Sequence, residues 1–129
     1  ARFYVNHTNR VDARWFEPIV EGMYQAVNGG GTGRIAMVPG LDICGKTGTA
    51  QNPHGADNST FFCFAPRNNP KIAVSVYIEN GGFGATVAAP IASLLTELYL
   101  TDTIQRAPLV EYVKNKQIAY PYYERQQRK

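Results

Sequence analysis

A seven-residue stretch, Gly-Lys-Thr-Gly-Thr-Ala-Gln at residues 45–51, constrains the fold more than any other part of this 129-residue chain. Thr47 and Thr49 are β-branched and alternate, which favours an extended strand. Gly48 between them leaves the backbone without a side chain, so another segment or a ligand can approach it closely. The ammonium group of Lys46 and the two threonine hydroxyls are donors suited to a carboxylate. The stretch therefore predicts a strand that carries an anion-binding site.

Two runs of apolar residues at helical spacing predict helices on either side of this strand. The first is expected to begin near residues 14–17 and to end at Asn28, where a run of glycines follows. The second is expected over residues 86–100, with its regular part starting close to Ala89 because Pro90 disrupts a helix interior. The side chains expected on the buried faces are Phe16, Ile19, Val20, Met23 and Val27 in the first helix, and Val87, Ile91, Leu94, Leu95 and Leu98 in the second.

Three strands are expected between these helices, over residues 41–51, 61–65 and 72–78. A short turn at residues 66–70 joins the last two strands, which must therefore pair as antiparallel neighbours. The third strand is apolar almost throughout, so we expect both of its faces to be covered. Together these elements predict an α+β fold, in which a three-stranded antiparallel sheet is flanked by helices.

Composition and charge narrow the classes of function. Hydrophobic residues make up 44% of the chain and charged residues 18%, which supports a packed core and argues against disorder. A net charge of +3 is too small to indicate a nucleic-acid partner. No apolar run reaches the roughly 18 residues of a membrane helix, no signal peptide opens the chain, and the first residue is Ala1. We therefore expect a segment of a longer protein, with any anchor upstream.

Within this segment, residues 1–107 are expected to belong to one domain, which is incomplete. Residues 108–129 are expected to form a short helix, with Pro108 in its first turn, and a mobile tail.

Two cysteines, Cys44 and Cys63, leave a disulfide open, but isolated cysteines are more often buried as small apolar side chains. His7 and His54 show no ligand spacing relative to either cysteine, so a zinc site is not favoured. His54 and Asp57 fall in a polar loop after the Lys-Thr-Gly strand, where a solvated turn explains both residues.

Residues 40–47 match the phosphate-loop pattern G-x-x-x-x-G-K-T, which raises nucleotide binding as an alternative. Such a loop needs a helix that starts directly after the Lys-Thr pair. Here Gly48 follows at once, and Asn52 and Pro53 prevent a helix soon afterwards. The spacer between the two glycines also has the pattern of a strand, so the nucleotide hypothesis is rejected.

A series of sequence blocks between residues 12 and 100 occurs in an order and spacing typical of one family. The blocks are Phe-Glu-Pro-Ile-Val-Glu-Gly-Met at 16–23, Gly-Thr-Gly at 31–33, Gly-Lys-Thr-Gly-Thr-Ala-Gln at 45–51, Phe-Ala-Pro at 64–66, Asn-Pro-Lys-Ile-Ala-Val at 69–74, Glu-Asn-Gly-Gly at 79–82 and Ala-Ala-Pro-Ile-Ala at 88–92. Through them the chain resembles the C-terminal part of the transpeptidase domain of a class B penicillin-binding protein, of the elongation type called penicillin-binding protein 2. The resemblance implies an incomplete portion of the fold shared by penicillin-binding proteins and serine β-lactamases. A β-lactamase or β-lactam sensor shares the triplet but not its surroundings, and is less favoured.

The resemblance implies a role for each residue of the strand. Lys46 would be catalytic, supplying positive charge near the nucleophile and the substrate carboxylate. The hydroxyls of Thr47 and Thr49 would bind that carboxylate, and the backbone N–H of Thr49 would be a catalytic oxyanion-hole donor. Gly48 would let the substrate backbone lie alongside the strand, and Phe83 is a candidate for lining the cleft. No metal, nucleotide or other cofactor is implied.

The implied function is that of a bacterial D,D-transpeptidase, which cross-links peptidoglycan stem peptides through a serine acyl-enzyme and binds β-lactam antibiotics. The full-length protein would lie at the periplasmic face of the inner membrane and act with elongation proteins and a glycosyltransferase. The alternative is a non-catalytic binding or scaffolding module of the cell-wall machinery that keeps the fold without turnover. The intact Lys-Thr-Gly-Thr sequence favours the enzyme.

Two motifs that this chemistry needs do not occur in the segment. None of Ser59, Ser75 and Ser93 has a lysine three positions on, as the nucleophile motif requires. The Tyr-Val-Asn triplet at residues 4–6 has the letters of the second motif but lies much closer to Lys46 than in the family. We therefore expect the nucleophile upstream and the segment alone to be inactive.

The resemblance also implies that two further strands belong beside the strand at residues 72–78. Without them that strand becomes an edge with unpaired backbone groups, and apolar faces are left uncovered. We therefore expect copies of the segment to associate with one another.

Overall fold

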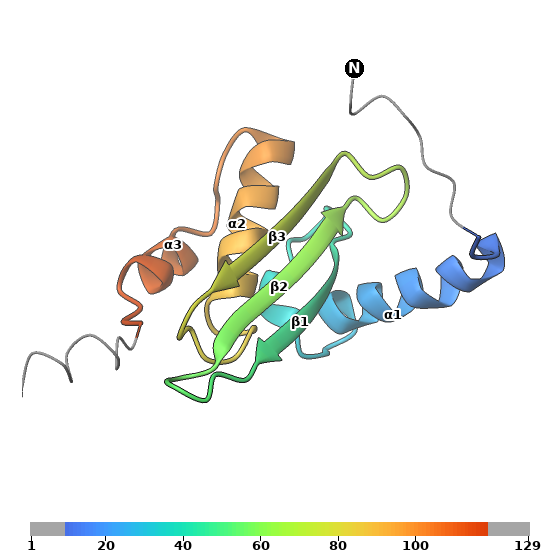
Figure 1. The fold of residues 1–129 in the computed structure, drawn as a ribbon. Coiled ribbons are helices and arrows are strands. Elements are labelled where there is room, and N and C mark those ends of the chain that lie inside the picture. Colours follow the sequence, from blue (N-terminus) through green and yellow to red (C-terminus); the bar gives the residue numbers. More distant parts are fainter. Residues whose placement is uncertain (1–9, 119–129) are drawn as a thin grey trace, which may run out of the picture.

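Figure 1 shows the computed structural model, which describes residues 10–118. Residues 1–9 and 119–129 lie outside the described part, and with them the Tyr-Val-Asn triplet at 4–6 and the predicted tail. The elements are the 3-10 helices η1 (Ala13–Trp15) and η2 (Arg34–Ala36), the α-helices α1 (Phe16–Asn28), α2 (Ala88–Thr101) and α3 (Ala107–Lys114), and the strands β1 (Cys44–Ala50), β2 (Asn58–Ala65) and β3 (Ile72–Ile78). Their order and type confirm the predicted α+β fold. Among the described helices, none is long and apolar enough to cross a membrane.

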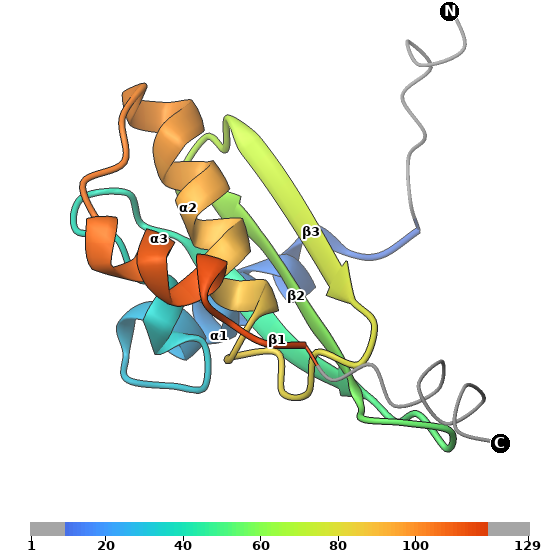
Figure 2. The ribbon, with the colours of Figure 1, turned by 90° about the vertical axis from the view of Figure 1, so that its left-hand side faces the viewer.

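The three strands form one antiparallel sheet in the order β1-β2-β3. Thr47 lies opposite Phe61 of β2, and Lys46 lies opposite Phe62. Directly opposite residues point to the same face of a sheet, and Phe61 is fully buried in the core together with residues of α2. Thr47 therefore belongs to the face that packs on α2, whereas Lys46 and the half-exposed Phe62 belong to the other, which we call the open face. Figures 1 and 2 both place α2 between α3 and the sheet.

The core lies between α2 and the sheet, and α2 reaches it through small side chains rather than leucines. Its members are Val27, Ala36, Val38, Ile43, Phe61, Cys63, Ala65, Ala88, Ala89 and Ala92. Ala88 and Ala92 are fully buried and Leu94 is nearly so, but Leu95 is 49% and Leu98 43% exposed. Because these side chains are small, the helix approaches the strands closely on this side. The side that carries Leu95 and Leu98 faces away from the sheet. The prediction that Leu95 and Leu98 face the core is therefore wrong.

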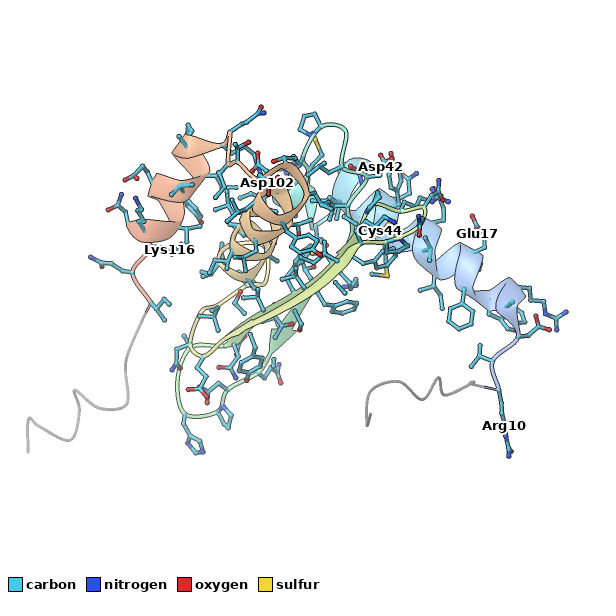
Figure 3. All side chains as sticks on the ribbon, turned by 90° about the horizontal axis from the view of Figure 1, so that it is seen from above. Arg10, Glu17, Asp42, Cys44, Asp102 and Lys116 are labelled. Atoms are coloured by element: carbon cyan, nitrogen blue, oxygen red, sulfur yellow. The ribbon has the colours of Figure 1, made fainter. Side chains whose placement is uncertain are left out.

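Only the C-terminal half of α1 packs on the body of the molecule. Val27 is buried as predicted, but Phe16 is 45% and Ile19 59% exposed, contrary to the prediction. Figure 3 shows that the part of α1 that carries Glu17 projects beyond the sheet, which explains the exposure of these two side chains. Within the described residues nothing is available to cover that half of the apolar stripe.

An ion-pair cluster fastens α1 to the turn after β2. The guanidinium of Arg67 donates from Nη1 to Glu21 Oε2 at 2.6 Å and from Nη2 to Glu17 Oε1 at 3.0 Å. Gln25 Nε2 donates to the other oxygen of Glu21 at 2.7 Å. The hydrogen bonds from Gln25 and Arg67 lower the pKa of Glu21, and the bond to Glu21 raises the pKa of Arg67.

The outer strand β3 is covered on one face only. Ala73, Ser75 and Tyr77 alternate with half-buried residues and are exposed on the open face. The prediction that both faces are covered is therefore wrong for the described residues, because every helix that packs on β3 lies on the other side. β3 is also an edge strand, as expected.

The two cysteines are buried and free. Cys44 lies opposite Phe64 and Cys63 lies opposite Gly45, so the two side chains point to different faces of the sheet and do not form a disulfide. Burial raises the pKa of both thiols. Their role as small buried side chains is confirmed.

Candidate active site

The Lys-Thr-Gly stretch forms the edge strand β1, as its alternating threonines predict. β1 runs through Lys46 and Thr47 to Ala50 and pairs with β2. Among the described residues, no strand pairs with its other side. No helix begins after the Lys-Thr pair, as a phosphate-binding loop would require. The structure therefore agrees with the rejection of the nucleotide hypothesis.

The predicted site residues lie on both faces of this edge strand. Thr47 and Thr49 lie on the face toward α2, with Thr47 half-buried and Thr49 exposed. Lys46 lies on the open face, where its ammonium nitrogen donates to the carbonyl oxygen of Thr47 at 2.7 Å. An ammonium has three donors, so this bond leaves two for a ligand. The two hydroxyls and the cation can act together only on a ligand that lies along the free edge of β1.

A hollow of about 760 Å³ opens beside the two threonines. It lies between β1, the glycine-rich segment after α1 and the loop that precedes α2. Its lining residues are Gly30, Gly31, Thr32, Arg34, Ile35, Thr47, Thr49, Phe83, Gly84, Ala85 and Thr86. The structure thus brings Thr47 and Thr49 into one cavity, whereas Lys46 does not line it.

Thr32 lines the hollow, although the sequence predicted no role for it. Its hydroxyl oxygen lies 2.9 Å from that of Thr47, and either one can donate. A hydroxyl has one donor and two acceptor positions. When Thr32 donates to Thr47, the O–H of Thr47 stays available for an anion in the hollow. The Thr32 hydroxyl can therefore orient that of Thr47 toward the hollow.

Among the described residues that line the hollow, Arg34 is the only charged one. It opens the short helix η2, which packs on α1 and α2 and is held by turn hydrogen bonds from Arg34 N–H to Gly31 and from Ala36 N–H to Gly33. Guanidinium groups pair with carboxylates through two parallel hydrogen bonds. Nothing in the local sequence pattern indicates that Arg34 lines the same hollow as Thr47 and Thr49, so this residue could not be predicted.

Gly84 lets the loop between β3 and α2 lie directly on the backbones of β1 and β2. A β-carbon on Gly84 would lie 2.6 Å from the carbonyl oxygen of Gly48 and still closer to that of Thr60. A β-carbon on Gly48 would in turn collide with the hydroxyl of Thr60. The close approach predicted at Gly48 therefore occurs, and within the described residues it is made by the chain itself.

The sequence excludes Ser59 as the nucleophile, because no lysine follows it three positions on. In the structure, Ser59 links β2 to the loop between β3 and α2. Its hydroxyl is fully buried, donates to the carbonyl oxygen of Phe83 at 3.0 Å and accepts from the N–H of Ala88 at 3.2 Å. These bonds fix both ends of the segment that carries Gly84. Phe83 itself is 70% exposed and lies on the rim of the hollow.

The polar loop after β1 is held by its own side chains. Asp57 accepts the N–H of Asn52 through its carboxylate at 3.2 Å and that of Gly82 through its carbonyl at 2.7 Å. The N–H of His54 donates to the side chain of Asn52 at 3.0 Å. These contacts agree with the turn expected for His54 and Asp57, and they join it to the loop that borders the hollow.

The sequence matches the family model described as the penicillin binding protein transpeptidase domain over residues 4–97. Among curated relatives, the chain is similar to the peptidoglycan D,D-transpeptidase MrdA of Haemophilus influenzae, with 39% identity over 116 residues. That match covers 77% of this chain and 17% of the relative. A probable peptidoglycan D,D-transpeptidase, PenA of Neisseria flavescens, is 37% identical over 63% of this chain and 23% of its own length. The chain thus spans less than a quarter of the length of these two relatives.

Solved structures give the same result for the fold. Penicillin-binding protein 2 of Pseudomonas aeruginosa, in complex with WCK 5153, matches with a TM-score of 0.63 and 38% identity, over 78% of this chain and 22% of that one. Penicillin-binding protein A of Mycobacterium tuberculosis, solved as an imipenem acyl-enzyme complex, matches with a TM-score of 0.58 and 29% identity, over 71% and 21%. The fold is therefore a partial penicillin-binding transpeptidase fold.

Proposed function

The chain belongs to the penicillin-binding protein transpeptidase family, and we propose that it supplies the Lys-Thr-Gly wall of the active site of a peptidoglycan D,D-transpeptidase. One observation carries this proposal. Thr47 and Thr49 place two hydroxyls at the free edge of β1, in a hollow that also receives Arg34. Two hydroxyls and a guanidinium form a receptor for the carboxylate at the end of a stem peptide or on a β-lactam.

The reaction needs a serine outside this segment. Its oxygen attacks the carbonyl carbon of the stem peptide, the peptide bond to the terminal residue breaks, and that residue leaves as an amine. An amine of a second stem peptide then attacks the acyl ester and releases the serine. The N–H of Thr49 would donate to the oxyanion formed in both steps. One such donor stabilises the transition state by about 3 kcal/mol. Lys46 would hold positive charge near the serine, and Gly48 would leave room for the peptide backbone.

A β-lactam would enter the same place and acylate the same serine. Penicillin-binding protein A of M. tuberculosis has been solved as an imipenem acyl-enzyme, and the chain shares 29% identity with it. The hollow beside Thr47 and Thr49 is open enough for such a ligand, with a volume of about 760 Å³. β-Lactam binding through these hydroxyls therefore belongs to the proposal.

The rest of the polypeptide would complete both the fold and the site. The free edge of β3 and the exposed side of α2 with Leu95 and Leu98 are the surfaces that further strands and helices of the domain would cover. We place the full-length protein at the periplasmic face of the inner membrane, with elongation proteins and a glycosyltransferase as partners. The segment alone would be inactive.

Intact-mass measurement of the full-length protein after incubation with penicillin tests this proposal. A stable mass increase of one penicillin per chain, located by peptide mapping on a serine outside this segment, is expected. A folded protein that takes up no penicillin and forms no cross-linked peptide would contradict it, and would favour the non-catalytic module of the same family.

A further inference from the structure

The helix α3 lies beyond the matched family region, which ends at residue 97. None of the residues of α3 is fully buried, although Leu109, Val110 and Val113 are half-buried, so its position depends on polar contacts as well as on this packing. Two of these contacts, one at each end, connect α3 first to α2 and then to the loop that lines the hollow.

The first contact fixes the start of α3 on α2. The carboxylate of Glu97, whose side chain is only 4% exposed, accepts from Arg106 Nε at 2.9 Å and from the N–H of Gln105 at 3.1 Å. Arg106 also donates from Nη2 to the hydroxyl of Ser93 at 3.2 Å. A buried carboxylate needs such partners, because an unpaired charge there is strongly unfavourable. This anchor therefore determines where α3 begins.

The second contact is made by Tyr112, about 9 Å further along the helix at 1.5 Å per residue. Its hydroxyl donates to the carbonyl oxygen of Thr86 at 2.9 Å. Thr86 closes a turn in which its own N–H donates to the carbonyl oxygen of Phe83 at 2.9 Å and its hydroxyl donates to the same atom. The turn at residues 83–86 therefore receives a bond from α3 at one end.

This turn is the wall of the hollow that faces the two site threonines. Phe83, Gly84 and Thr86 line the hollow together with Thr47 and Thr49. A movement of the turn would change the space in which a ligand carboxylate contacts those hydroxyls.

The apolar contact between α3 and the body is partial, because Leu109, Val110 and Val113 are only half-buried. A second hollow, of about 640 Å³, is lined by residues at the start of α3 and by Ile35 and Met37. Tyr112 is 38% exposed, so removing its hydroxyl should not disturb the core. The bond to Thr86 can therefore be tested without unfolding the protein.

We propose that α3 is a brace for the active site and that Tyr112 is a positioning residue, which holds the 83–86 turn against β1 through Thr86. The effect on acylation rests on the proposed function, whereas the bracing of the turn does not. Loss of one such hydrogen bond corresponds to about a 2- to 10-fold change in an equilibrium or rate.

The test compares Tyr112→Phe with Tyr99→Phe, which removes the hydroxyl of an exposed tyrosine of α2, both in the full-length protein. Hydrogen exchange of peptides covering residues 79–88 is expected to be about 2- to 10-fold faster in Tyr112→Phe only. Penicillin acylation of the same variant is expected to slow by a similar factor, with the unfolding temperature unchanged.

The outcomes separate the two proposals. If wild type is acylated and Tyr112→Phe changes neither exchange nor acylation, the brace is overturned. Faster exchange with unchanged acylation would overturn the positioning role. A lower unfolding temperature with unchanged acylation per folded molecule would also overturn it, since that is the result of a purely structural role. If wild type is not acylated, the proposed function fails, and the exchange comparison still supports or overturns the brace.

Discussion

The hydroxyl oxygens of Thr32 and Thr47 lie 2.9 Å apart, which joins the segment after α1 to the strand that carries the Lys-Thr-Gly triplet. Thr32→Val keeps the shape of the side chain but removes this partner. We expect penicillin acylation of the full-length protein to slow about 2- to 10-fold, because the Thr47 hydroxyl loses its orientation. Stopped-flow acylation rates measure this. Thr103→Val, in the linker after α2, is the matched control, and equal rates for both variants would argue against the role of Thr32.

Arg34 is expected to attract the carboxylate of the ligand into the hollow. Arg34→Gln should weaken the binding of an anionic β-lactam by about 1.5–3 kcal/mol, the value of a hydrogen bond to a charged group. The affinity of wild type should also fall as salt is raised, and that of the variant should fall less. Arg14→Gln, which alters an exposed ion pair outside the hollow, is the control. The same salt dependence in wild type and Arg34→Gln would show that Arg34 does not contact the ligand.

Gly84→Ala should destabilise the protein by about 1–3 kcal/mol, as other overpacked sites do. The added carbon would lie 2.6 Å from the carbonyl oxygen of Gly48, so the loop or the strand must move. Urea unfolding of the full-length protein measures the cost. Gly22→Ala, in α1 where a β-carbon meets nothing within 4 Å, should be neutral or stabilising by up to about 1 kcal/mol. Equal stabilities would contradict the close contact of Gly84 with β1.

The segment of residues 1–129 is expected to associate with itself when it is produced alone. The free edge of β3 and the exposed Leu95 and Leu98 leave backbone donors and apolar area uncovered. Light scattering should give a mass that rises with concentration, and Leu95→Lys with Leu98→Lys should reduce that rise. A monodisperse monomer at high concentration would count against the prediction.

The elements of this fold follow from local sequence, whereas their exposed faces do not. The alternation of Thr47 and Thr49 predicts β1, and the glycines after Asn28 predict the end of α1, because both signals act between neighbours in the chain. Leu95 and Leu98 have the spacing of a buried stripe but are exposed, since α2 packs through its alanines. Periodicity identifies an apolar stripe without showing which partner covers it.

The candidate site could be predicted only in part, because sequence patterns identify residues that are neighbours in the chain. Lys46, Thr47 and Thr49 are adjacent in one motif, so the sequence alone singles them out. Arg34 lines the hollow and Tyr112 donates to Thr86 in its wall, and both residues come from segments outside the motif. Their contribution depends on how η2 and α3 fold back, and no local pattern encodes that.

The rate at which fluorescent penicillin labels the full-length protein tests the central claim most directly, with Lys46→Ala compared against Lys71→Ala. Lys71 is an exposed lysine before β3 and is the control for loss of one positive charge. Lys46→Ala should lower the labelling rate at least about 100-fold, the usual minimum for a group that assists proton transfer or stabilises charge. Lys71→Ala should label as wild type does. Equal labelling of all three folded proteins would contradict the assignment of β1 as a wall of the active site.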